Sequence, residues 1–120
     1  MKLHHVQLAI PEGGENAARR FYAETLGLTE VAKPPALAAR GGCWFRGTEL
    51  EIHLGVEAAF RPARKAHPGV LLKGLDDLEG LAARLRTAGV EVEWDDGFPG
   101  YRRFYADDPH GNRLEFLASA

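Results

Sequence analysis

A separation of 62 residues occurs twice among the polar side chains of this 120-residue chain. It relates His5 to His67 (67 − 5 = 62) and His53 to Glu115 (115 − 53 = 62). A fixed period indicates that one structural unit is duplicated within the chain. Because His and Glu at fixed positions on strands are what a divalent metal site needs, the repeat bears on chemistry as well as on architecture.

Two glycines with the same separation support the duplication. Gly27 and Gly89 (89 − 27 = 62) each follow a stretch with helical periodicity, where glycine commonly ends a helix. Each half of about sixty residues would be marginally stable alone. The chain contains 45% hydrophobic residues and can bury one core. We therefore expect the two halves to share that core and to form a single domain.

Apolar periodicity and turn signals predict the same element order in both halves. The first half reads as a strand, a helix and three strands, over residues 3–10, 15–26, 29–33, 39–46 and 49–54, with a turn at residues 34–35. The corresponding elements of the second half cover residues 69–73, 76–89, 90–94, 102–106 and 113–117. The predicted fold is α+β, with two tandem βαβββ modules. They cover residues 1–55 and 67–120 of one domain, and residues 56–66 are a linker.

Strand alternation predicts where the special side chains point. In the first strand Val6, Leu8 and Ile10 share the apolar face, so His5 faces the other way. The same alternation turns four more side chains away from the apolar faces of their strands: Glu51, His53, His67 and Glu115. If the apolar faces pack against the helices, the modules form a curved mixed sheet with helices outside. The polar side chains then line an inner cleft.

The overall composition narrows the class of partner. The formal net charge of −2 and the scattered basic residues give no nucleic-acid footprint and no polybasic membrane patch. No apolar run approaches the roughly 18 residues that a membrane span requires. The N-terminus leads into a strand pattern, which is not typical of a signal peptide. We expect a cytoplasmic protein whose partners are small molecules, and we expect its single cysteine, Cys43, to be a buried thiol.

The chain resembles the vicinal oxygen chelate superfamily, which contains glyoxalases, extradiol dioxygenases, fosfomycin-resistance enzymes and bleomycin-binding proteins. The resemblance covers nearly the whole chain and rests on segments 5–10 (HVQLAI), 21–28 (FYAETLGL), 67–72 (HPGVLL) and 108–115 (DPHGNRLE). It implies paired βαβββ modules around a cleft, a divalent metal and frequent homodimers. It also implies that the cleft is formed either within one chain or between two chains.

The resemblance also implies a set of metal ligands. Three ligand positions of the family correspond to His5, His67 and Glu115 in this chain. The resemblance also implies a fourth ligand on the last strand of the first module. The 62-residue offset selects His53 for that position, while Glu51 lies two residues earlier on the same face. Both remain candidates at this point. If the cleft forms between chains, His5 and His53 come from one chain, and His67 and Glu115 come from the other.

Imidazole and carboxylate ligands suit Zn²⁺, Ni²⁺, Mn²⁺ or Fe²⁺. The expected chemistry is chelation of a substrate with adjacent oxygens and stabilisation of an enediolate or alkoxide, in a lyase, isomerase or thiol-transfer reaction. Glu115 or Glu51 would be the general base. One alternative is a metal-free binding or resistance protein that sequesters an aromatic drug or metabolite. A second alternative is an extradiol-type dioxygenase that uses Fe²⁺.

Several other polar residues have less specific patterns. His4 has the opposite parity to His5, and His110 lies in a segment with turn signals, so neither histidine is expected to bind metal. Asn112 lies in the same segment and is expected to take part in a turn rather than in catalysis. Arg102 and Arg103 are adjacent, so alternation predicts that only one of them faces the cleft. An inward arginine would favour an anionic substrate. The aromatic side chains are expected mainly in the core.

Overall fold

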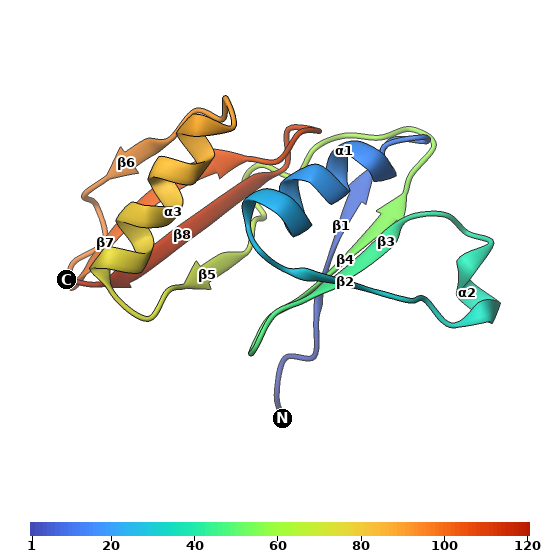
Figure 1. Ribbon diagram of the computed structural model, residues 1–120, viewed down its shortest axis with the longest axis horizontal. Coiled ribbons are helices and arrows are strands. Elements are labelled where there is room, and N and C mark those ends of the chain that lie inside the picture. The colour runs from blue at the N-terminus through green and yellow to red at the C-terminus, as the bar shows by residue number, and fades with distance from the viewer.

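The computed structural model describes residues 1–120. The first half of the chain forms a four-stranded sheet with strand order β1-β4-β3-β2, and a helix lies across one face of it (Figure 1). β1 and β4 are parallel, and the other neighbours are antiparallel. The elements are β1 (Val6–Ile10), α1 (Glu15–Arg19), η1 (Arg20–Thr25), β2 (Thr29–Val31), α2 (Pro35–Ala38), β3 (Cys43–Arg46) and β4 (Glu51–Val56).

The second half repeats this arrangement. Its sheet has the order β5-β8-β7-β6, again with the first and last strands parallel and the other neighbours antiparallel. The elements are β5 (Gly69–Leu71), α3 (Leu75–Thr87), β6 (Glu93–Asp95), β7 (Tyr101–Asp107) and β8 (Arg113–Ser119). The predicted pair of βαβββ modules is confirmed, with the mixed sheet divided into two four-stranded sheets.

Some element boundaries differ from the sequence-based expectation. The first strand begins at Val6, so His5 precedes it, because the first ladder partner on β4 is Ile52. Residues 34–35 do not form only a turn, since Pro35 starts the short helix α2, where its fixed φ is compatible with the first helical turn. The predicted first helix consists of α1 followed directly by a π-helical turn, η1. This turn carries the buried side chains Phe21 and Tyr22.

Buried hydrophobic side chains from both modules belong to one cluster of 18 residues. The ring of Tyr22 stacks on Phe45 with centroids 5.5 Å apart in the first module, and Phe104 packs against Phe116 at 5.3 Å in the second. Because each module alone buries few large side chains, the shared cluster is what allows a chain of this length to have one core.

A buried polar loop also connects the modules. The Tyr22 hydroxyl donates a hydrogen bond to Oδ2 of Asp108 at 2.8 Å. The fully buried Asn112 donates from Nδ2 to that same oxygen and to the carbonyl of Ala9 in β1. Its Oδ1 accepts from the Ala63 amide at 2.8 Å. Asn112 therefore does more than complete a turn, because its bonds join β1, the linker and the second module.

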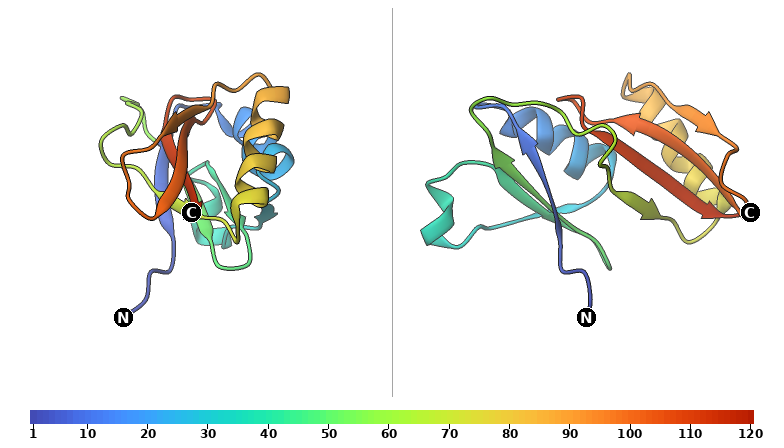
Figure 2. Two further views of the ribbon diagram at one scale, coloured as in Figure 1. Left: turned by 90° about the vertical axis from the view of Figure 1, so that its left-hand side faces the viewer. Right: turned by 180° about the vertical axis from the view of Figure 1, so that it is seen from behind.

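The helices α1 and α3 lie on one side of the two sheets (Figure 2). We call the opposite side of each sheet its open face, since no helix covers it. Side chains on the helix side, such as Ile52, Phe104 and Phe116, are buried in the core. No helix has both the length and the apolar character of a bilayer-spanning segment. The open faces carry the polar side chains that alternation assigned to a cleft.

Candidate metal centre

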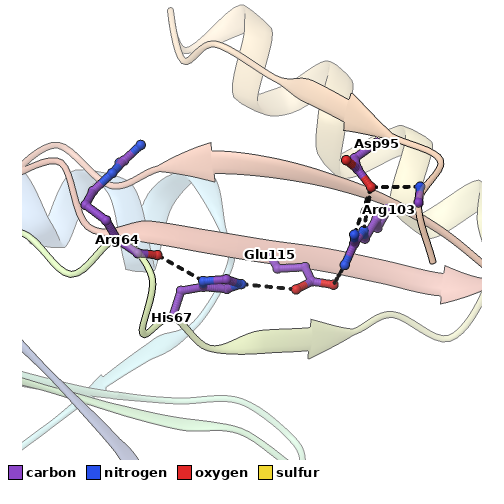
Figure 3. A network of polar contacts seen from close by, with 6 residues as sticks. Arg64, His67, Asp95, Arg103 and Glu115 are labelled. Atoms are coloured by element: carbon purple, nitrogen blue, oxygen red, sulfur yellow. Dashed lines mark hydrogen bonds and ion pairs between the residues drawn. The ribbon is translucent and has the colours of Figure 1, made fainter.

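His67 and Glu115 meet on the open face of the second sheet (Figure 3). Glu115 lies in the middle of β8, opposite Tyr105 of β7. The Glu115 amide donates to the Pro68 carbonyl at 3.0 Å, and this bond brings the chain before β5 alongside β8. The Nε2 atom of His67 is thereby 3.2 Å from Oε2 of Glu115, and both side chains are largely buried. The predicted proximity of these two residues is observed.

The atoms of this pair are arranged as two metal ligands would be. Nδ1 of His67 lies 3.0 Å from the Arg64 carbonyl, which can only accept a hydrogen bond, so Nδ1 carries the proton. In a neutral imidazole the lone pair is then on Nε2 and faces the carboxylate oxygen. Two acceptors at 3.2 Å need a proton or a cation between them. Two ligands at about 2.1 Å from one ion are about 3.0 to 3.4 Å apart, which brackets this distance.

The other oxygen of Glu115 is held by an arginine. Nη1 of Arg103 donates to Oε1 of Glu115 at 3.1 Å. Nε and Nη2 of the same guanidinium donate to Oδ1 of Asp95 at 3.0 and 2.8 Å. The Gly97 amide and Arg103 both donate to Asp95 and lower the pKa of its carboxyl, while Asp95 and Glu115 raise the pKa of Arg103. The network in Figure 3 thus runs without a break from Arg64 to Asp95.

The first module places His53 in an aromatic sandwich. One face of its ring stacks on Trp44, with centroids 3.8 Å apart and planes 1° apart. The other face stacks on His5 at 3.9 Å. Nε2 of His53 pairs with Oε2 of Glu51 at 2.7 Å. Burial lowers the pKa of His53, against the opposing effect of Glu51. Its imidazole is therefore held in the neutral form that a metal ligand requires.

Glu51 is bound on both oxygens. Oε1 accepts from Nε of Arg46 at 2.6 Å, and Oε2 pairs with His53. These hydrogen bonds, first that of Arg46 and then that of His53, lower the pKa of Glu51 to about 2. A carboxylate stabilised in this way is a weak base. Glu51 would accept a proton readily only after Arg46 or His53 had moved away from it.

The four predicted ligands thus form two separate pairs. His5 and His53 are stacked in the first module, and Nε2 of His67 lies 3.2 Å from Oε2 of Glu115 in the second. Nowhere in the chain do three or more His, Cys, Asp or Glu side chains gather closely enough to hold a metal ion. One chain in this conformation therefore brings the four candidates together only two at a time. The facing atoms of His67 and Glu115 suit a divalent ion, whereas the stacked rings of His5 and His53 would have to turn before both could face the same ion.

The adjacent arginines follow strand alternation. Arg103 faces Glu115, whereas Arg102 points to the helix side, where it pairs with Glu79 of α3 at 3.2 Å and lies over Trp94. The inward arginine is not free for a ligand, because three of its nitrogens already donate to carboxylates. The expectation that the two arginines lie on opposite faces of the strand is confirmed, with Arg103 on the face of Glu115.

Arg113 lies two residues before Glu115 on β8, in surroundings that the sequence did not reveal. It lies on the same face of β8 as Glu115, and its cross-strand neighbour Asp107 pairs instead with Arg64 at 2.7 Å. Its guanidinium lies over the Tyr105 ring at 4.9 Å, and its buried Nε has no hydrogen-bond partner. A cavity of about 460 Å³ opens beside it. Alternation predicts the face of Arg113, but not that its acidic neighbour is already paired.

The remaining polar candidates have structural roles. Nε2 of His110 lies 2.9 Å from the Gly14 carbonyl, and the His110 amide donates to Asp108. His4 contacts His5 through their Nδ1 atoms. Cys43 is buried as expected, and burial raises the pKa of its thiol to about 11, which makes it unreactive near neutral pH.

Comparison with known proteins agrees with this architecture. A crystal structure of a glyoxalase family protein from Bacillus anthracis has 44% sequence identity and a TM-score of 0.93, over 100% of this chain and 96% of that chain. Lactoylglutathione lyase from Agrobacterium tumefaciens has 19% identity and a TM-score of 0.73, over 98% of this chain and 94% of that chain. No curated protein sequence matches significantly.

A mutant of the fosfomycin resistance protein FosX from Listeria monocytogenes, in complex with Mn(II) and a dihydroxypropylphosphonic acid, has 18% identity and a TM-score of 0.79. The match covers 99% of this chain and 92% of that chain. At this level of identity, the FosX and lyase matches concern the fold. The sequence profile of the Glyoxalase/Bleomycin resistance protein/Dioxygenase superfamily matches residues 2–116. With two βαβββ modules and this match along nearly its whole length, the chain belongs to that superfamily.

Proposed function

We propose that the protein is a metal-dependent enzyme of the glyoxalase type, acting as a lyase, isomerase or thiol transferase on a small substrate with adjacent oxygens. The proposed ligands are His5, His67 and Glu115, with His53 as the fourth. One observation carries this proposal: Nε2 of His67 lies 3.2 Å from Oε2 of Glu115, while Nδ1 of His67 is bonded to the Arg64 carbonyl. This tautomer leaves the ligand nitrogen available.

We further propose that the complete ligand set forms between two chains. The two ligand pairs lie next to strands at sheet edges, since β1 and β5 each have a neighbour on one side only. His5 and Leu71 beside these edges are exposed. Contact between two chains commonly buries open strand edges and exposed apolar side chains. A symmetric dimer would bring the first module of one chain to the second module of the other, twice.

The side chains have distinct proposed roles. When bound, a divalent ion would polarise the substrate oxygens and stabilise negative charge that develops on them. Glu115, or Glu51 once released from Arg46, would move a proton on the substrate. Arg113 lies beside a cavity that is also lined by Glu91, Glu93, Asp107 and Asp108, so this cavity does not by itself favour an anionic substrate. Neutral His53 would complete the ligand set or orient the substrate.

The test is metal analysis of the protein purified without chelators or a histidine tag. We expect near-stoichiometric Zn, Ni, Mn or Fe in the parent and none in a triple variant in which His5, His67 and Glu115 are replaced by alanine. The variant should retain its circular dichroism spectrum, because these side chains contribute little to the core. A parent that remains empty after incubation with each of the four ions would contradict the proposal.

A metal-free binding protein is the second candidate function. The flat Trp44 ring on the open face of the first sheet, already stacked on His53, supports binding of a planar aromatic compound. The two functions predict different responses. A binder would quench Trp44 fluorescence with an aromatic ligand whether or not metal is added, whereas the enzyme would need the metal for tight binding. Oxygen consumption with a catechol and Fe²⁺ would instead indicate the dioxygenase reaction.

A further inference from the structure

We propose that Arg103, held by Asp95, is a positioning residue that determines which oxygen of Glu115 is presented to the metal. This inference rests on the proposed metal function. Glu115 has two chemically equivalent oxygens, and an unrestrained carboxylate can present either or both of them to a cation. In the structure Oε1 is bonded to Arg103 and Oε2 faces His67, so the two oxygens have different partners.

The arginine itself is fixed from its other side. Asp95 of β6 is the direct cross-strand partner of Arg103 on β7. Its Oδ1 accepts from Nε and Nη2 of Arg103, and from the Gly97 amide. The backbone amide anchors the carboxylate, and the carboxylate anchors two of the guanidinium nitrogens. Nη1 is thereby directed along the open face toward Glu115 at 3.1 Å.

Aromatic rings limit the remaining freedom of the guanidinium. Its Cζ atom lies 5.4 Å from the centroid of Phe98 and 5.3 Å from that of Tyr105. Only 18% of the Arg103 side chain is exposed. Rotation away from Glu115 would break the bonds to Asp95 and both ring contacts. Arg103 is therefore pre-organised before any metal binds.

Positioning and charge have opposite effects on metal affinity. Residues that orient a metal ligand typically account for roughly 10 to 100-fold of the affinity. A guanidinium near the ion also repels it, but Asp95 neutralises that charge locally. If orientation dominates, removing the arginine weakens metal binding. If charge dominates, the same substitution strengthens it. The sign of the change distinguishes the two effects.

The experiment is a calorimetric titration of metal-free protein with Mn²⁺ and with Zn²⁺, for the parent, Arg103→Gln and Arg102→Gln. Arg102 is a matched control, because it is the neighbouring arginine and has its own ion pair and aromatic contact on the opposite face. We expect affinity about 10-fold weaker or more in Arg103→Gln, and unchanged affinity in Arg102→Gln. The melting temperature of each metal-free variant separates loss of positioning from loss of fold.

Two further variants sharpen the result. Asp95→Asn combined with Arg103→Gln keeps the net charge of the pair, so it should still bind metal weakly if orientation is the cause. Arg103→Lys keeps one bond to Glu115 and should recover part of the affinity. Equal or tighter binding by Arg103→Gln, with a parent that binds well, would overturn this inference alone. A parent that binds neither ion would overturn the proposed function, and this inference with it.

Discussion

The hydroxyl of Tyr22 donates to Oδ2 of Asp108 at 2.8 Å, and this bond joins residues that are 86 positions apart in the chain. Tyr22 is fully buried and Asp108 nearly so. Burial, and then the Asp108 carboxylate, raise the pKa of Tyr22 well above its usual value. The bond lies where the π-helical turn of the first module meets the β7–β8 loop of the second. It therefore contributes to how the two modules are placed.

Replacing Tyr22 by phenylalanine is expected to lower the free energy of unfolding by roughly 1–3 kcal/mol at pH 7, because a buried acceptor loses a donor. The parent should also lose stability as the pH rises above about 10, since the unfolded tyrosine then ionises while the folded one stays neutral. The variant should lack this part of the decline. Urea unfolding at about pH 7 and about pH 10.5, on either side of the ordinary tyrosine pKa, with Tyr101→Phe as control, measures both effects. Equal pH dependence in parent and variant would contradict the assignment.

His67→Ala is expected to remove most of the metal affinity and leave the fold intact. The side chain offers Nε2 beside Glu115 and lies outside the hydrophobic core. His110→Ala is the control, since Nε2 of His110 lies 2.9 Å from the Gly14 carbonyl and its ring lies beside Phe60, away from the proposed ligands. Calorimetric titration with Zn²⁺ and a thermal melt of each metal-free variant test this. Parent-like affinity in His67→Ala would exclude it as a ligand.

Mixing two inactive variants tests whether the site spans two chains. In a mixed dimer of His5→Ala and His67→Ala chains, one cleft would lack both histidines and the other would have the full set. We therefore expect about half of the clefts in mixed dimers to regain tight metal binding after joint refolding. If each cleft forms within one chain, mixing should restore nothing. Light scattering of the parent provides the oligomeric state for this comparison.

Two glycines with nearly the same backbone angle should respond differently to alanine. Gly27 has a φ of +80° and open space where a Cβ would lie, so Gly27→Ala should cost about 1–2 kcal/mol of backbone strain. Gly42 has a φ of +81°, and a Cβ there would collide with the Leu54 carbonyl of β4. We expect a loss of about 3 kcal/mol or more in Gly42→Ala. Chemical denaturation of both variants measures the difference.

Much of the site geometry within each module was predictable. The alternation of β8 indicated that Glu115 faces away from the core, and the same reasoning separated Arg102 from Arg103. These predictions succeeded because the direction of a strand side chain is a local property with a period of two residues. The start of the first strand was less predictable, since the ladder begins at the pair Val6 and Ile52 although β4 itself begins one residue earlier, at Glu51.

The partners of the charged side chains were not predictable. Arg103 bonds to Glu115 and Asp95, while Arg113 remains without an acidic partner because Asp107 pairs with Arg64. Each choice depends on distances of a few ångströms between strands and the linker. Sequence spacing carries no information at that scale. The stacking of His53 between Trp44 and His5 is a further example, since it depends on the register of β3 against β4.

The sequence by itself determined the duplicated βαβββ order, the apolar face of each strand and the residue types offered to a metal. These follow from local periodicity and from the 62-residue repeat. Strand geometry fixes the face to which each side chain points, so the periodicity of the sequence predicts that face directly. Only the tertiary structure decided that the candidate ligands form two separate pairs, His5 with His53 and His67 with Glu115. The relative placement of the modules depends on long-range packing, including the buried bond between Tyr22 and Asp108, and no local pattern encodes it.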